Sequence, residues 1–152
     1  MEITKREMQR VGFTASTFDL LHAGHVAMLR EAKDQCDYLI CGLQIDPSAD
    51  RPEKNSPIQT VVERYSQLSA IRYVDEILVY ATEQDLLDIL TMYKIDVRIL
   101  GVEYKDKEFT GRDLCDTLDM DLYFNSREHR FSTSDLRKRV VWAESDFVNK
   151  NK

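Results

Sequence analysis

Apolar and polar positions along the chain alternate in two different rhythms, which predict strands and helices in turn. Some runs are short and nearly continuous in apolar residues, as expected for strands that are buried on both faces of a parallel sheet. Between them, apolar residues recur every three or four positions, which is the spacing of one helix face. The expected strands are 11–16, 38–43, 76–80, 97–100 and 122–124, and the expected helices are 25–36, 61–71, 82–93, 111–118 and one capped by 132–135.

This alternation of strands and helices is typical of βαβ units with right-handed crossovers. It predicts an α/β fold with a doubly wound, five-stranded parallel sheet. The chain has 152 residues, so we expect a single domain over 1–152 with a core of about 10–142. Ligands of such sheets bind at the carboxyl ends of the strands, which here are followed by the loops 14–25, 44–58, 101–110 and 125–134.

Charge and composition narrow the class of protein. The formal net charge is −6, whereas a protein whose main partner is a nucleic acid backbone is expected to be basic. No run approaches the ~20 apolar residues of a membrane span, and the first ten residues lack the apolar stretch of a signal peptide. Three cysteines without a CxxC pair suggest neither disulfides nor a zinc site. We therefore expect a cytoplasmic protein with neither a nucleic acid nor a membrane as its partner.

The first loop carries the most specific chemistry. It contains neither the GxGxxG nor the GxxxxGK[ST] pattern, but it reads His22-Ala-Gly24-His25 at the start of the first expected helix. A helix N-terminus favours an anion, and a glycine lets a bound group approach the backbone closely. Two imidazoles one turn apart at such an end can both donate hydrogen bonds to one phosphate.

A second anion-binding segment is expected near the end of the chain. Residues 127–139 contain five basic and two acidic residues, although the chain as a whole is acidic. Ser132 and Thr133 place hydroxyl groups at the start of the last helix. A local cationic cluster at a helix N-terminus can hold a polyphosphate despite the net acidity of the protein.

With these motifs in place, the sequence resembles the HxGH nucleotidyltransferases, and within them the glycerol-3-phosphate cytidylyltransferase group. The resemblance extends over roughly 10–140 and rests on STFDLLHAGH at 16–25, IRYVDEI at 71–77, ILGVEY at 99–104 and RxxxxSTS at 127–134. It implies a Rossmann-like nucleotidyltransferase fold and a homodimer. It also implies transfer of a nucleoside monophosphate from CTP to a small phosphate monoester, with Mg²⁺ as cofactor and release of pyrophosphate.

The resemblance also implies roles for individual residues, including a mobile lysine that closes over the triphosphate. The expected catalytic residues are His22, His25, Lys54 and Arg127. The expected nucleotide-binding residues are Thr17, Phe18, Gly24, Gly101, Ser132 and Thr133. The expected acceptor-binding residues are Asp19, Asp46, Arg64, Arg72 and Asp75, of which Arg72 and Asp75 are also candidates for a dimer contact. No residue is assigned as a metal ligand.

None of the expected site residues forms an activated nucleophile such as a Ser–His–Asp set. A phosphate monoester has a second pKa near 6, so it is mostly dianionic at neutral pH and can attack the α-phosphorus without a general base. Catalysis then consists of positioning and charge stabilisation.

The sequence departs from the glycerol-3-phosphate group at two places. Glu128, His129 and Arg130 replace small and acidic residues, and Ser16 replaces a glycine. Several acceptors therefore stay open: glycerol 3-phosphate, phosphoethanolamine, phosphocholine, a sugar phosphate or another phosphorylated polyol. ATP in place of CTP, as in an adenylyltransferase, and a non-catalytic nucleotide-binding module are the alternatives.

Overall fold

The protein is built around a five-stranded, fully parallel sheet with the strand order β3-β2-β1-β4-β5. The computed structural model describes residues 9–152. The strands are β1 (Val11–Ser16), β2 (Tyr38–Gln44), β3 (Glu76–Tyr80), β4 (Val97–Gly101) and β5 (Asp121–Asn125). The expected α/β class and the doubly wound five-stranded sheet are thereby confirmed. The predictions for the first eight residues, including the start of the domain and the missing signal peptide, lie outside the described residues.

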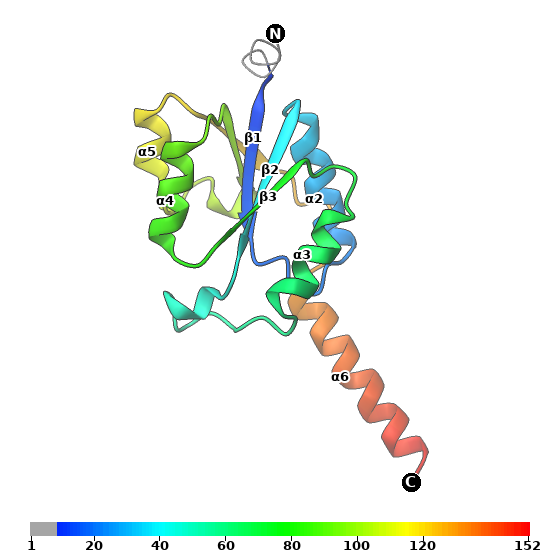
Figure 1. Cartoon of the computed structure of the whole chain (residues 1–152). Helices are drawn as coiled ribbons and strands as arrows, with labels where there is room; N and C mark the ends of the chain where they lie inside the picture. Colours follow the sequence, from blue (N-terminus) through cyan, green and yellow to red (C-terminus); the bar gives the residue numbers. More distant parts are fainter. Residues whose placement is uncertain (1–8) are drawn as a thin grey trace.

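Helices cover both faces of this sheet (Figure 1). On one face α2 (Ala23–Asp34) and α3 (Val61–Ser69) bury Leu29 and Leu68 against β2 and β4. On the other face α4 (Glu83–Met92) and α5 (Arg112–Thr117) pack against β1 and β2. Two short 3₁₀ turns, η1 (Pro47–Ala49) and η2 (Val102–Tyr104), follow β2 and β4.

The helix starts follow from local capping. Thr60 and Thr82 each accept a hydrogen bond from the third residue of their helix, whose side chain bonds back to the capping residue. Such reciprocal pairs satisfy N–H groups that have no partner inside the helix. The first helix, α2, begins two residues before the predicted start because His22 is its cap.

The last helix, α6 (Thr133–Lys150), extends away from the body of the protein (Figure 1). It contains no buried residue, and Trp142 is 70% exposed. The apolar positions of this helix therefore face solvent rather than the sheet, and the expected domain core of about 10–142 stays a prediction. Among the described helices, α6 included, none is long and apolar enough to cross a membrane.

The strand order places a reversal point beside β1. From β1 the chain moves outward through β2 and β3, and it then returns to the opposite side of β1 for β4 and β5. Loops that leave β1 and β4 in opposite directions open a crevice between the carboxyl ends of these two strands. The functional site is expected at this crevice.

Candidate active site

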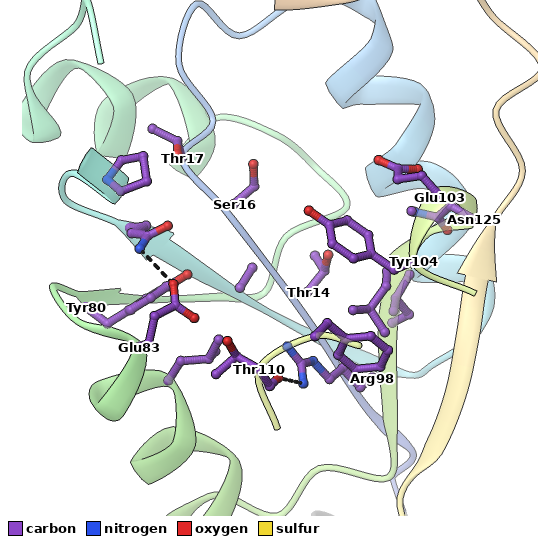
Figure 2. A pocket seen from close by; sticks show the side chains of 18 of the residues that line it. Thr14, Ser16, Thr17, Tyr80, Glu83, Arg98, Glu103, Tyr104, Thr110 and Asn125 are labelled. Carbon is purple, nitrogen blue, oxygen red and sulfur yellow. Dashed lines mark hydrogen bonds between the residues drawn. The ribbon is translucent and has the colours of Figure 1, made fainter. Parts of the chain in front are cut away.

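A pocket of about 390 Å³ lies at the reversal point of the sheet. Its wall is formed by residues 14–17 of β1 and the following loop, by residues 98–101 of β4, and by the ends of the neighbouring strands. Figure 2 shows the polar side chains of Thr14, Ser16 and Thr17 along one wall of this pocket. Thr17 and Met28 belong to the wall, so the pocket borders the loop and the helix that carry the two histidines.

The two histidines form the N-terminal cap of α2. His22 accepts a hydrogen bond at Nδ1 from the backbone N–H of Gly24 (3.0 Å), and His25 accepts one at Nδ1 from the backbone N–H of His22 (3.2 Å). The rings lie 4.0 Å apart between centroids. The HAGH motif is thus a capping box built from two imidazoles rather than from a hydroxyl and a carboxylate.

These backbone bonds determine which ring nitrogen carries the proton. A nitrogen that accepts a hydrogen bond is unprotonated, so in both neutral rings the proton resides on Nε2. Burial lowers the pKa of His25 to about 4, with a further contribution from His22 and an opposing one from Asp19. Burial also lowers the pKa of His22, followed by the effects of His129 and Arg139. At neutral pH both side chains are therefore neutral donors through Nε2.

The N-terminus of α6 meets this cap. His22 Nε2 lies 3.1 Å from Thr133 Oγ1 in the first turn of α6, and Ser132 caps that helix by accepting from the N–H of Asp135. Two helix N-termini with their unpaired N–H groups therefore converge at one place, which favours an anion. The sequence predicts the segment from 127 to 134 opposite the HAGH loop, and Ser132 and Thr133 do lie there.

Gly24 allows this convergence because it has no side chain. A Cβ at this position would lie 2.8 Å from His22 Cε1 and 2.9 Å from His129 Cε1. The two rings flank the glycine so closely that any larger residue has to displace one of them. The expected role of Gly24 thus has a steric basis in the structure.

Three of the other residues expected at the site line the pocket, and Arg127 does not. Thr17, Lys54 and Gly101 line it, and the Lys54 side chain is exposed at its edge. Arg127 is also exposed, on the segment between β5 and α6.

Arg64 is expected from the sequence to bind the acceptor phosphate, and the structure gives its side chain other partners. Its side chain is 2% exposed, and its N–H groups donate to the carbonyl oxygens of Thr17, Gln44, Ile45 and Gln59 at 2.6–3.1 Å. Four of the five N–H groups of the guanidinium are thus occupied by carbonyl oxygens. These hydrogen bonds connect the loops that follow β1 and β2.

Asp19 is expected from the sequence to bind the acceptor. Instead, its two carboxylate oxygens accept the backbone N–H groups of Ile58 and Gln59, each at 2.9 Å. Asp19 therefore ties the HAGH loop to the end of the loop that carries Lys54. Its effect on the site is one of positioning.

Phe18 and Asp46, which are also expected at the site, contact residues close to them in the sequence. Phe18 is 1% exposed and its ring lies 5.7 Å from that of His25, so its side chain supports a histidine rather than facing a ligand. Asp46 accepts the backbone N–H and the hydroxyl of Ser48, and these bonds lower its pKa. Asp46 caps η1 in this way, and its expected contact with the acceptor stays a prediction.

Asp75 and Arg72 precede the amino end of β3, whereas the pocket lies at the carboxyl ends of the strands. Asp75 directly precedes β3 and accepts from Lys33 Nζ and from the backbone N–H of Leu39. The pocket residue of this strand is Tyr80, at its carboxyl end. Five residues of strand, at about 3.3 Å each, separate Asp75 from this end, and Asp75 does not line the pocket. Acceptor binding by Asp75 stays a prediction. Arg72 is exposed and stacks over Tyr73.

Several polar residues of the pocket are not among those expected from the sequence. Arg98 and Asn125 are 5% and 4% exposed, and both line the pocket. Tyr80 and Glu83 line it at the end of β3 and the start of α4 (Figure 2). The sequence does contain a signal for Arg98, because it places an arginine inside an otherwise apolar strand. Arginine is almost never fully buried unless it is paired, so such a position indicates a partner or a ligand.

The described residues hold no group of three or more histidine, cysteine or acidic side chains able to bind a metal. Mg²⁺ is usually held by only one or two carboxylates together with substrate phosphates and waters.

The chain combines a pocket at the reversal point of a parallel sheet with two helix N-termini that converge at a pair of neutral imidazoles. These are features of a nucleotide-binding α/β protein. The match to known families agrees with this class. Residues 13–139 match the model of the cytidylyltransferase-like family, and the chain belongs to this family of nucleotidyltransferases.

Similar proteins include two that bear the name bifunctional protein HldE. The one from Paramagnetospirillum magneticum is 38% identical over 111 residues, which cover 72% of this chain and 22% of that protein. The one from Campylobacter concisus is 32% identical over 145 residues, which cover 95% of this chain and 30% of that protein. This chain thus spans less than a third of either relative.

Among solved structures, a lipopolysaccharide core biosynthesis protein from Thermoplasma volcanium has the same fold, with a TM-score of 0.66. It is 24% identical, and the match covers 80% of this chain and 99% of that one. A pantoate-beta-alanine ligase from Francisella tularensis is 15% identical, with a TM-score of 0.58 over 82% of this chain and 61% of the other. These two likenesses bear on the fold.

Proposed function

We propose that this protein transfers a nucleoside monophosphate from a nucleoside triphosphate to a sugar phosphate and releases pyrophosphate. The observation that carries the proposal is the pair of imidazoles whose Nδ1 atoms are occupied by backbone N–H groups. This arrangement leaves the Nε2–H groups of both rings as neutral donors, and that of His22 lies at the N-terminus of α6. The similarity to the proteins named HldE favours a sugar phosphate over glycerol 3-phosphate as acceptor.

In the proposed reaction the phosphate of the acceptor attacks the α-phosphorus in line with the departing pyrophosphate. Its oxygen forms the new P–O bond while the bond to the β-phosphate oxygen breaks, and the electron pair leaves with pyrophosphate. His22 and His25 donate to the oxygens of the α-phosphate, where negative charge accumulates. Lys54 and Arg127 neutralise the leaving pyrophosphate. A bound Mg²⁺ would supply further positive charge for the phosphates.

Neutral imidazoles suit this task. A histidine that donates through Nε2 while its Nδ1 is held by the backbone keeps one orientation, so little reorganisation is needed in the transition state. Because burial lowers the pKa of both side chains, they stay in this form across the physiological pH range. No general base is required, since the attacking phosphate is already ionised.

The test is a panel of CTP, ATP, GTP and UTP against phosphate monoesters with Mg²⁺, with pyrophosphate release as the readout. The acceptors include sugar 1-phosphates of hexoses and heptoses, glycerol 3-phosphate, phosphocholine and phosphoethanolamine. The proposal expects turnover with a sugar phosphate and one preferred nucleotide. Nucleotide binding without pyrophosphate release from any pair would instead identify a non-catalytic nucleotide-binding module.

A further inference from the structure

The pocket contains a buried cation that the fold leaves incompletely paired. Arg98 on β4 is 5% exposed and forms no ion pair within the described part of the chain. Its Nη1 donates to the carbonyl oxygen of Thr110 at 2.5 Å and makes a long contact of 3.9 Å with Cys115 Sγ. A guanidinium has five N–H donors, so most of its hydrogen-bonding capacity is unused.

Arg64 provides a comparison inside the same molecule. Both arginines are buried to a similar degree, but Arg64 donates to four carbonyl oxygens and does not line the pocket. Arg98 lines the pocket and has one strong acceptor. A buried charge is normally paired or fully hydrogen-bonded. The missing partner of Arg98 is therefore expected to come from the pocket.

The loop behind Arg98 holds its guanidinium in place. The charged group stacks over the ring of Phe109 at 5.0 Å, and a Cβ on Gly111 would lie 3.0 Å from its Nη1. Residues 109–111 therefore cover the rear of the guanidinium. Figure 2 shows the arginine at the pocket, directed toward Thr110. Such a preset cation can bind an oxyanion with little further ordering.

Groups that can bind hydroxyls line the same pocket across from Arg98 (Figure 2). Tyr80 is buried, and burial followed by the nearby Glu83 raises the pKa of its phenol, so the hydroxyl remains a donor. Glu83 contacts Gln44 Nε2 and Arg51 Nη2 only at 3.4 Å, so its carboxylate can accept hydrogen bonds from a ligand. A pocket with a cation on one side and a phenol and a carboxylate on the other suits a molecule that carries both an oxyanion and several hydroxyl groups.

We propose that Arg98 binds the phosphate of the acceptor, and that Tyr80 and Glu83 bind its hydroxyl groups. The acceptor class is then a phosphorylated polyol or sugar. This assignment rests on the proposed function and gives Arg98 the role that the sequence predicts for Arg64. It also explains why an arginine occupies an otherwise apolar strand.

The experiment compares Arg98→Met with Arg112→Met. Arg112 stacks over the same Phe109 ring at 5.1 Å but does not line the pocket, so its replacement removes an equivalent cation–π contact and no pocket charge. Hydrogen bonds to charged groups are worth about 1.5–3 kcal/mol, so Arg98→Met is expected to raise the KM for the acceptor roughly 10- to 100-fold. The KM for the triphosphate is expected to stay within twofold, and Arg112→Met to resemble the wild type.

Arg98→Lys keeps the charge and is expected to recover part of the acceptor KM, which also covers the case in which Arg98→Met does not fold. An unchanged acceptor KM in a folded Arg98→Met variant overturns the proposal. A rise confined to the KM for the triphosphate overturns it as well, because Arg98 would then serve the nucleotide.

A binding measurement separates this inference from the proposed function. Inorganic phosphate is titrated into a His22→Asn background, in which the site at the helix N-termini is impaired, while the backbone amide NMR signals of Thr110 and Gly111 are followed. Shifts that are present when Arg98 is intact and absent after the Arg98→Met substitution support the anion site even if no substrate pair releases pyrophosphate. Shifts that are absent in both proteins overturn it, whatever the turnover.

Discussion

At the scale of single residues, the two histidines of the HAGH motif have a double role. Their Nδ1 atoms cap α2, and their Nε2 atoms remain as donors. Folding and chemistry therefore use opposite sides of the same imidazole rings. This separation makes it possible to remove one role while keeping the other.

The substitution His22→Asn keeps the capping role of this residue and removes its donor role. An asparagine oxygen can replace Nδ1 as the acceptor for the Gly24 N–H, since asparagine is among the best capping residues. It has no donor at the position of Nε2. Turnover is expected to fall by about 100-fold or more, while the thermal midpoint changes little. Steady-state kinetics and thermal unfolding measure both effects, and near-normal turnover in the folded variant would remove His22 from the mechanism.

A second prediction at this scale concerns acid stability. The pKa of His25 is about 4 in the folded protein and near 6.5 when unfolded. Between these two pH values His25 is protonated in the unfolded chain but not in the folded protein. The free energy of unfolding is therefore highest above neutral pH and decreases as the pH falls toward 4. Because each pKa unit corresponds to about 1.36 kcal/mol, the free energy of unfolding is expected to fall by an amount on the order of 3 kcal/mol.

The control for this prediction is His25→Asn, which keeps an acceptor for the His22 N–H but cannot be protonated. Urea unfolding at pH 7 and pH 4.5 is expected to show a smaller acid destabilisation in the variant than in the wild type. An equal loss in both proteins would mean that His25 does not carry the acid sensitivity.

At the scale of elements, the loops of the site are held by buried polar anchors rather than by apolar packing alone. Asp19 and Arg64 connect the HAGH loop, the end of β2 and residues 58–59 through six hydrogen bonds. The loop that carries Lys54 is thereby fixed at both ends, while the lysine side chain stays exposed. This combination allows a cation to move over a ligand without loosening the sheet.

Asp19→Asn tests this anchor. Asparagine offers one acceptor oxygen where two are used, so one buried backbone N–H loses its partner at a cost of about 1–3 kcal/mol. We expect a lower free energy of unfolding by this amount, measured in urea, and a higher KM for the triphosphate. Asp50→Asn is the matched control, since Asp50 accepts a backbone N–H from Glu83 with only one oxygen. Equal effects of the two substitutions would argue against the anchor.

At the scale of the whole molecule, charge and packing are unevenly distributed. The chain is acidic overall, but the segment 127–139 is basic and leads into α6. The first turn of α6 belongs to the candidate site, whereas the remainder of the helix exposes Val140, Val141, Trp142 and Phe147. The helix therefore serves the site at one end without contributing to the core. Association into a homodimer stays a prediction, to be measured by light scattering.

Truncation separates the two ends of α6. Removing residues 143–152 takes away no buried side chain, so the free energy of unfolding is expected to change by no more than about 0.5 kcal/mol. Pyrophosphate release is expected to persist. A deletion that begins at residue 132 removes Ser132 and Thr133 as well, and turnover should be lost. Chemical denaturation and the pyrophosphate assay check both chains, and strong destabilisation by the shorter deletion would show that α6 packs on the body.

The sequence by itself determined the fold class, the order of elements and the location of the HAGH and Ser132–Thr133 segments. These follow from local periodicity and from short motifs, which are written in consecutive residues. Only the tertiary structure decided what each polar residue contacts. Arg64 and Arg98 are both arginines beside apolar residues, yet one is surrounded by carbonyl groups and the other faces a pocket. That difference depends on loops far away in the sequence, whose arrangement no local pattern encodes.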